Sequence, residues 1–239
     1  MKRGFAGFPP EGIEFFAKLM RNNRREWFQP RKEIFETRLK QPMRELVEAL
    51  NGELKKFAPD YVTDPDKAIY RIYRDTRFSN DKTPYKDHIA ASFFRRGGSG
   101  HGTGGFYCAV SHKEVAIGGG VYMPDAELLM AMRQRIAERH EELRRLLRAK
   151  AVRTLLGELQ GEQLTRVPKG FPADHPSADL LRYKRFILYV ELAPELATSG
   201  ELFGEIATRF RAIAPFVKFL AEARAVEPKS RAPQFPIEV

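Results

Sequence analysis

Residues 106–122 read FYCAVSHKEVAIGGGVY. Aromatic and β-branched residues gather in both halves of this stretch, which is typical of two short strands. The polar residues 111–114 between the halves have the character of a tight hairpin turn, and a hairpin pairs its two strands antiparallel. The stretch therefore predicts an antiparallel sheet at the centre of the fold.

Similar strand character appears at residues 67–74, 87–94 and 186–191. Helical periodicity of the apolar residues precedes and follows these strands, at residues 10–22, 31–57, 124–147 and 201–223. Helices at both ends of the chain, with mostly consecutive strands between them, favour an α+β fold over a parallel α/β sheet. We expect a mainly antiparallel sheet of about five strands, packed with N-terminal and C-terminal helices.

The chain has 239 residues, of which 43% are hydrophobic, so it can bury a large core. We expect one α+β domain over residues 1–225. Residues 226–239 contain three prolines and no periodicity, which predicts an extended or mobile tail. Neither the oligomeric state nor a cofactor is indicated by the sequence.

The number of cysteines and the distribution of apolar residues indicate where in the cell the protein is expected. Cys108 is the single cysteine and cannot form an internal disulfide, and the N-terminus has no secretory pattern. We therefore expect a cytoplasmic protein in which Cys108 is a buried structural residue. No run approaches the roughly 18 apolar residues that a membrane-spanning helix needs, so no membrane partner is expected. The Cys and His spacings match no strong zinc pattern, and no metal site is predicted.

Forty-one Lys and Arg residues against 31 Asp and Glu give a net charge of +10. Such a charge attracts phosphorylated molecules and polyanions over long range.

The strongest local signal for a functional site is residues 71–86, which read RIYRDTRFSNDKTPYK. Arginine binds phosphate or carboxylate with a two-pronged fork, and lysine supplies a movable charge. The segment thus predicts a site for an anionic small molecule, with these ligand-binding residues: Arg71, Arg74, Arg77, Lys82, Tyr85 and Lys86.

Two other interpretations of this segment remain open. Asp75 lies between Arg74 and Arg77, where it can anchor an internal salt-bridge network that only fixes the loop. If the protein is an enzyme, Asp75 or His175 is the candidate catalytic base, with the arginines stabilising developing negative charge. For His175 the alternative is that Asp174 caps a helix starting at Pro176 and the histidine packs against it.

A nucleic-acid-binding protein is the alternative function. The predicted helix over residues 133–153 carries eight basic residues against three acidic ones. Together with the basic segment, such a helix can follow a phosphate backbone, whereas a solvated and salt-bridged helix face is the other explanation.

The spacing R-x-x-R-D-x-R-F-x-x-x-K-x-P-Y, which begins at Arg71 and ends at Tyr85, resembles the signature of a widespread bacterial family known only as a domain of unknown function. Two further patterns are similar to this family, N-N-x-x-E-W-F at residues 22–28 and P-x-G-F-x-x-D-H-P at residues 168–176. The resemblance spans residues 5–219. The resemblance implies a bacterial protein of this size, but it indicates no reaction, cofactor or catalytic residue.

Overall fold

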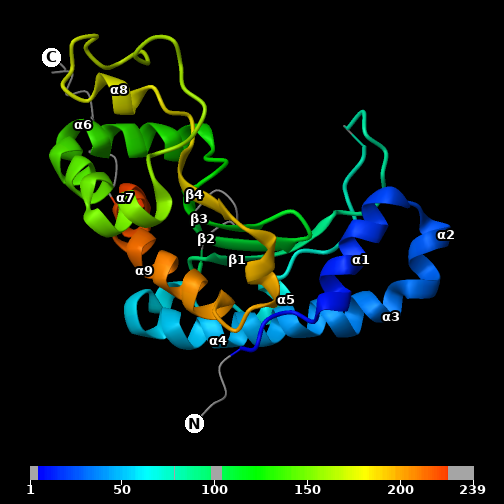
Figure 1. The fold of residues 1–239 in the computed structure, drawn as a ribbon. Helices are drawn as coiled ribbons and strands as arrows, with labels where there is room; N and C mark the ends of the chain where they lie inside the picture. Colours follow the sequence, from blue (N-terminus) through cyan, green and yellow to red (C-terminus); the bar gives the residue numbers. More distant parts are fainter. Residues whose placement is uncertain (1–4, 78, 98–103, 226–239) are drawn as a thin grey trace, which may run out of the picture.

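The computed structural model describes residues 5–77, 79–97 and 104–225 (Figure 1). The predicted tail at 226–239 lies outside the described residues. Four strands form one sheet in the order β1-β2-β3-β4, and each neighbouring pair is antiparallel. The strands are β1 (His88–Phe94), β2 (Gly105–Ser111), β3 (Val115–Val121) and β4 (Phe186–Leu192). The predicted α+β fold with an antiparallel sheet is thus confirmed.

The turn between β2 and β3 forms for a local reason. The hydroxyl oxygen of Ser111 accepts hydrogen bonds from the backbone amides of Lys113 and Glu114, each at 3.0 Å. A serine that binds the amides following it stabilises a tight turn. This turn sets the register in which Ser92, Tyr107, Gly118 and Tyr189 form one row across the sheet.

The strand predicted at residues 67–74 is wrong. The Asp64 carboxylate accepts a hydrogen bond from the amide of Asp66 at 2.9 Å, and Pro65 follows as the first residue of α5 (Pro65–Ala68). A capping carboxylate and a proline at the first position both favour a helical turn. Beyond α5 the chain is extended, but it forms only isolated bridges among the described residues, Ile69 with Ala91 and Tyr73 with Tyr85.

The N-terminal helices follow the predicted periodicity. Helix α1 ends at Arg21, within one residue of the predicted end. The helix predicted over residues 31–57 contains a π-helical turn at Glu36–Lys40, just before Pro42, which lacks the amide that a regular helix uses. The helices are α1 (Pro10–Arg21), α2 (Arg25–Phe28), α3 (Lys32–Phe35) and α4 (Gln41–Phe57).

Four helices lie in the C-terminal half of the described chain. The Asp125 carboxylate caps α6 by accepting a hydrogen bond from the Leu128 amide at 2.7 Å, and Arg139 has a non-helical backbone where α6 kinks. The long connection between β3 and β4 contains three of these helices, and the fourth follows β4. They are α6 (Ala126–Arg148), α7 (Lys150–Leu156), α8 (Ala178–Leu181) and α9 (Leu202–Ala221).

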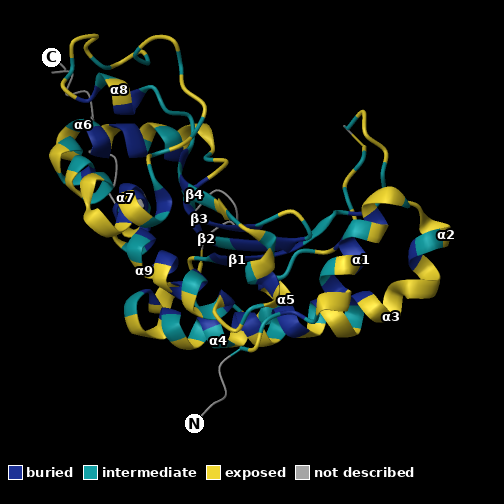
Figure 2. Ribbon diagram, in the orientation of Figure 1, coloured by how far each residue is buried: buried dark blue, intermediate teal, exposed yellow. Residues whose placement is uncertain are grey.

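The core lies between one face of the sheet and helices α4 and α9 (Figures 1 and 2). Side chains alternate between the two faces of a strand, and Phe93 and Phe106 both point to Phe210 of α9, with ring centroids 5.5 and 5.0 Å away. The face opposite α4 and α9 is called the outer face below. Each sheet edge pairs with a short extended segment, β1 through the bridge from Ala91 to Ile69 and β4 through the bridge from Ile187 to Gln160. Among the described residues, no helix has the length and apolar composition needed to span a membrane.

Candidate functional site

The basic segment forms a projecting hairpin, here called the motif hairpin (residues 72–86). Its two arms are joined by backbone hydrogen bonds from Arg74 to Pro84 at 2.9 Å and from Lys86 to Ile72 at 2.8 Å. In Figure 1 it is the teal loop that rises beside α1. The chain thus turns back on itself, and the charged residues divide between the tip of the hairpin and its base.

Asn23 fixes the motif hairpin to the N-terminal helices. Its side-chain amide donates to the carbonyl oxygen of Tyr85 at 2.8 Å, and its amide oxygen accepts from the Tyr85 backbone N–H at 3.1 Å. The Tyr85 ring is buried and stacks on Phe28, with ring centroids 4.1 Å apart. Asn23 and Phe28 therefore belong to the same structural unit as the basic segment. Tyr85, predicted to orient a ligand, packs its ring into this unit.

At the tip of the hairpin, acids and bases pair with each other. The Arg74 guanidinium contacts the Asp81 carboxylate, and Arg77 donates to Asp75 through Nε at 3.0 Å and Nη2 at 2.7 Å. The Lys82 ammonium donates to the backbone oxygen of a neighbouring residue, Thr76, at 2.9 Å. Asp75 therefore pairs with Arg77, as the salt-bridge interpretation expects, but Arg74 pairs with Asp81 and not with Asp75.

These pairs also set the acidity of the two carboxylates. The hydrogen bonds from the Arg77 side chain lower the pKa of Asp75 to about 2. The pKa of Asp81 is also lowered to about 2, by the Thr83 amide first and by Arg74 second. A catalytic base works best with a pKa near the operating pH, so a carboxylate of this kind is a weak base at neutral pH.

Arg71 and Lys86 lie at the base of the hairpin, toward the sheet. The Lys86 ammonium sits 4.9 Å from the centroid of the Tyr70 ring. Burial lowers the pKa of Lys86, and the positive charge of Arg71 lowers it further. The Lys86 amide donates to the carbonyl oxygen of Ile72, the residue after Arg71, so the two cationic residues are neighbours along the backbone at the base of the hairpin. Within the described residues, neither Arg71 nor Lys86 forms an ion pair with a carboxylate. Among the described residues, the base of the hairpin thus carries two cations without a carboxylate partner, whereas at the tip only Lys82, which donates to a backbone oxygen, has none.

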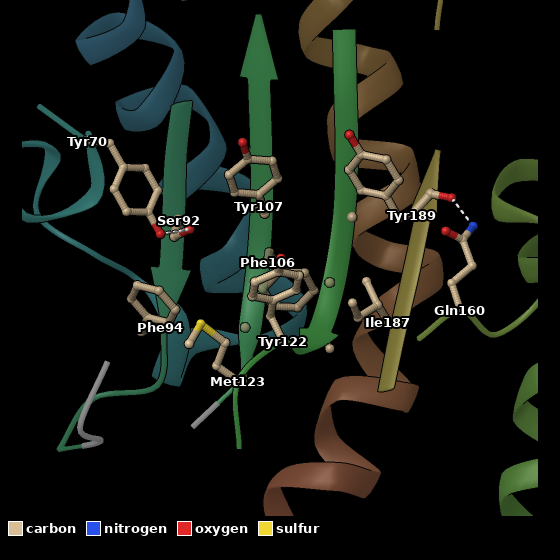
Figure 3. A pocket seen from close by; sticks show the side chains of 15 residues that line it. Tyr70, Ser92, Phe94, Phe106, Tyr107, Tyr122, Met123, Gln160, Ile187 and Tyr189 are labelled. Atoms are coloured by element: carbon tan, nitrogen blue, oxygen red, sulfur yellow. Dashed lines mark hydrogen bonds between the residues drawn. The ribbon is translucent and has the colours of Figure 1, made fainter. Parts of the chain in front are cut away.

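Beside Tyr70, the outer face of the sheet is hollowed (Figure 3). The hollow has a volume of about 610 Å³. The register explains its shape. The row Phe94–Gly105–Gly120–Ile187 places glycines on both central strands between larger side chains, and the row Ser92–Tyr107–Gly118–Tyr189 places a third glycine on β3 between two tyrosines. Tyr122 and Met123, both exposed, stand at one end of the hollow in Figure 3.

The glycines on β3 are required by the approach of β4. A Cβ atom on Gly118 would lie 2.8 Å from the Leu188 carbonyl oxygen, and one on Gly120 would lie 2.0 Å from that of Phe186. Gly120 also has a φ of 128°, which side-chain-bearing residues rarely adopt. At Gly118 and Gly120 the floor of the hollow consequently has no side chains. Sequence reasoning missed this site, although three consecutive glycines inside a strand signal a close approach.

Three tyrosines border the hollow on the side away from Met123. The Tyr70 and Ser92 hydroxyls are hydrogen-bonded at 2.8 Å, and the Tyr189 hydroxyl donates to Glu191 at 3.2 Å. Burial raises the pKa of Tyr107 and of Tyr189 far above the ordinary value. All three phenols therefore keep their protons at neutral pH. The rings pack over a row of alanines, Ala90, Ala109 and Ala116.

A smaller polar recess of about 190 Å³ lies on the other side of the tyrosines and shares Tyr107 and Tyr189 with the hollow. Its charged residues come from the start of β1 and the β2–β3 turn. The Asp87 carboxylate contacts His88 Nδ1 at 3.1 Å and the Lys113 ammonium at 3.3 Å. These two contacts, that with His88 first, lower the pKa of Asp87.

His175 packs against His140 of α6, with ring centroids 6.0 Å apart. In Figure 1, α6 and α8 lie on the opposite side of the molecule from the motif hairpin. Its Nδ1 atom accepts hydrogen bonds from the amide and the hydroxyl of Ser177, at 3.1 and 2.9 Å. Asp174 does not cap a helix at Pro176 as expected, because α8 begins at Ala178 after Ser177. The structure therefore does not bring His175 and Asp75 together.

The arginine-rich segment 133–153 is divided between α6 and α7, and most of its cations have structural contacts. Arg133 is buried and donates to the carbonyl oxygens of Leu181 and Tyr183, at 2.9 and 3.1 Å. Arg135 is buried and paired with Glu222. Ion pairs also hold Arg139 to Glu142, Arg144 to Asp179 and Arg153 to Glu158. The segment presents less free positive charge than its composition indicates.

Cys108 is completely buried, as expected, and burial raises the pKa of its thiol to about 12. In the described ranges, His, Cys, Asp and Glu side chains do not gather in any group of three or more that is able to hold a metal ion. The hollow and the base of the motif hairpin are thus the remaining candidates for a ligand-binding site.

The fold and this site define an α+β protein with a four-stranded antiparallel sheet and an aromatic hollow on its outer face. Residues 11–219 match the model of a family described as conserved hypothetical protein (DUF2461). The match covers most of the chain, which therefore belongs to this family, and the predicted membership in a family of unknown function is confirmed. No curated protein and no solved structure is significantly similar to the chain.

Proposed function

We propose that this protein binds a small anionic molecule on the outer face of its sheet, with Lys86 and Arg71 as the residues that recognise the charge. One observation carries the proposal: Lys86, which has no ion-pair partner in the described chain, lies 4.9 Å from the centroid of the Tyr70 ring, and Tyr70 borders a hollow of about 610 Å³. Small-molecule sites are typically concave and largely apolar, with a few polar groups that fix orientation.

The other predicted ligand-binding residues receive a different role in this proposal. Arg74 and Arg77 are held by Asp81 and Asp75, so an anion has to displace a carboxylate to reach either guanidinium. We assign these pairs, with Lys82, to the shape of the motif hairpin. No reaction is proposed, because Asp75 is a weak base and His175 belongs to a different part of the molecule.

Binding of single-stranded nucleic acid is the second candidate function. The observation in its favour is the set of tyrosines on the outer face, Tyr70, Tyr107 and Tyr189, since aromatic side chains on a sheet provide stacking platforms for bases. The net charge of +10 also favours the binding of nucleic acid, which is negatively charged. The arginine-rich helices contribute less to this function than their sequence predicts, because most of their arginines are engaged.

The test is a thermal-shift and calorimetric screen of phosphate, pyrophosphate, nucleotides and dicarboxylates at two salt concentrations. A ligand of the folded state raises the melting temperature by mass action. We expect Lys86→Met and Arg71→Met each to weaken the binding of the anion by about tenfold, the low end of what a charged hydrogen bond contributes.

Lys82→Met is the matched control, because it removes the same charge from the tip of the same hairpin. Equal losses of anion affinity in Lys82→Met and Lys86→Met contradict the assignment of the anion site to the base of the hairpin. Stabilisation by oligonucleotides alone, disappearing at high salt, favours the second candidate function.

A further inference from the structure

We infer that the ligand of this site is a nucleotide or a close analogue, in which a flat ring lies on the glycine floor of the hollow and a phosphate reaches Lys86 and Arg71. This inference rests on the proposed function and names the class of ligand. It is carried by the shape of the floor, the residues around it and the distance to the cations.

The floor suits a planar ring because three of its positions have no side chains. Gly105 and Gly118 are buried and Gly120 is half-buried, and all three line the hollow between larger residues. Phe94, Ile187 and Met123 border this floor with apolar or polarizable surface (Figure 3). A flat heteroaromatic ring fits over these glycines, between the side chains that border them, better than a bulkier aliphatic group does.

The spacing of the strands sets the length of the ligand. Strands in a sheet lie about 4.8 Å apart, so the glycines of β3 are roughly 10 Å from β1, with Tyr70 beyond that edge. A ring on the floor therefore needs a spacer to place its anionic group beside Lys86. The Tyr70–Ser92 hydroxyl pair lies along this path and offers hydrogen bonds to a polar spacer such as a sugar. Phosphate and pyrophosphate are too short to use both ends.

The enclosure of the hollow favours a single nucleotide over a polymer. Tyr122 and Met123 stand at one end, and the row of Tyr107 and Tyr189 borders the other (Figure 3). The volume of about 610 Å³ falls within the usual range for sites of drug-sized molecules, roughly 300–1,000 Å³. A strand of nucleic acid needs an open path beyond both ends.

Calorimetry with the full chain tests the inference, using ADP, GDP, UDP and flavin mononucleotide against pyrophosphate and adenosine. A ring held between Phe94, Ile187 and Met123 buries apolar surface, which pyrophosphate cannot do. We therefore expect at least one of the nucleotides to bind about tenfold more tightly than pyrophosphate, and adenosine to bind more weakly than ADP.

Two variants locate the ring. Ile187→Trp should fill the hollow and reduce nucleotide affinity to that of pyrophosphate, with pyrophosphate binding unchanged. Met130→Trp, at an exposed position on α6, is its control. Met123→Ala is a milder change at the exposed rim and should weaken only the ring-bearing ligands, so the inference stays testable if Ile187→Trp does not fold.

Each outcome has a separate meaning. If pyrophosphate binds as tightly as every nucleotide, the ring inference is wrong and the anion site stands. If Ile187→Trp folds and keeps full nucleotide affinity, the ring lies elsewhere and the inference also fails. If none of these ligands binds, the inference and the proposed function fail together. If oligonucleotides bind and mononucleotides do not, the inference and the proposed function are both wrong, and the ligand is a nucleic-acid strand.

Discussion

Replacement of Asn23 by alanine provides the sharpest test of how the motif hairpin is held. The variant removes both hydrogen bonds to the Tyr85 backbone, at 2.8 and 3.1 Å, and leaves a partly buried N–H and C=O without their partner. A typical hydrogen bond contributes about 1 kcal/mol, and an unsatisfied buried group costs about 1–3 kcal/mol. Because the site is only partly buried, we expect Asn23→Ala to lower the free energy of unfolding by about 2–3 kcal/mol.

Urea unfolding measures this loss as a lower midpoint with an unchanged slope. The melting temperature should fall by roughly 4–12 °C, since about 1 kcal/mol corresponds to 2–4 °C in a protein of this size. The neighbouring Asn22 is a matched control, because its side chain donates to the exposed Lys18 carbonyl oxygen at 3.0 Å. Asn22→Ala should stay within about 0.5 kcal/mol of the parent. Equal losses in the two variants refute the role of Asn23 as the anchor of the hairpin.

Two further predictions concern charge. The folded pKa of Asp81, about 2, lies below its ordinary 3.8, so its contribution to stability is present above pH 4 and is lost as the pH falls toward 2. The amide resonance of Thr83, which donates to Asp81 at 2.9 Å, should titrate with a midpoint near pH 2, and a midpoint near 4 refutes the pairing. Arg133→Ala leaves two carbonyl oxygens unpaired and should lower the free energy of unfolding by about 2–4 kcal/mol, whereas exposed Arg145→Ala should change it by less than about 0.5 kcal/mol. Similar unfolding curves for these two variants contradict a structural role of Arg133.

The four strands were predictable because their signals are local. Branched and aromatic residues are frequent in β1, β2 and β4, and Ser111 closes the central hairpin by accepting hydrogen bonds from the amides two and three residues ahead. The helices were predictable from periodicity for the same reason. In each case the residues that specify the element also lie within it.

The error at residues 67–74 shows where local signals compete. The alternation there is real, but Asp64 and Pro65 start a helical turn, and the remaining extended residues find partners only at single positions. Whether an extended segment becomes a strand depends on the backbone of its neighbour. For Tyr73 that neighbour is Tyr85, whose own position depends on Asn23.

The candidate site was predicted only in part. The basic segment was evident, and its internal pairing was one of the two interpretations that the sequence left open. Which charges pair could not be predicted, because Arg74 meets Asp81 only when the hairpin closes. The hollow was missed since Tyr70, Gly118 and Gln160 come from separate parts of the chain and meet through the sheet register.

The two bridges at the sheet edges also bear on self-association. An uncovered edge strand offers a row of unpaired amides and carbonyls to any other extended chain, which invites aggregation. Here the Tyr70 amide bonds to the Ala90 carbonyl at 2.9 Å on one edge, and Gln160 and Ile187 exchange backbone hydrogen bonds of 2.8 and 3.1 Å on the other. Short segments from the protein's own chain therefore occupy part of each edge, which restricts the sheet's growth by addition of a foreign strand.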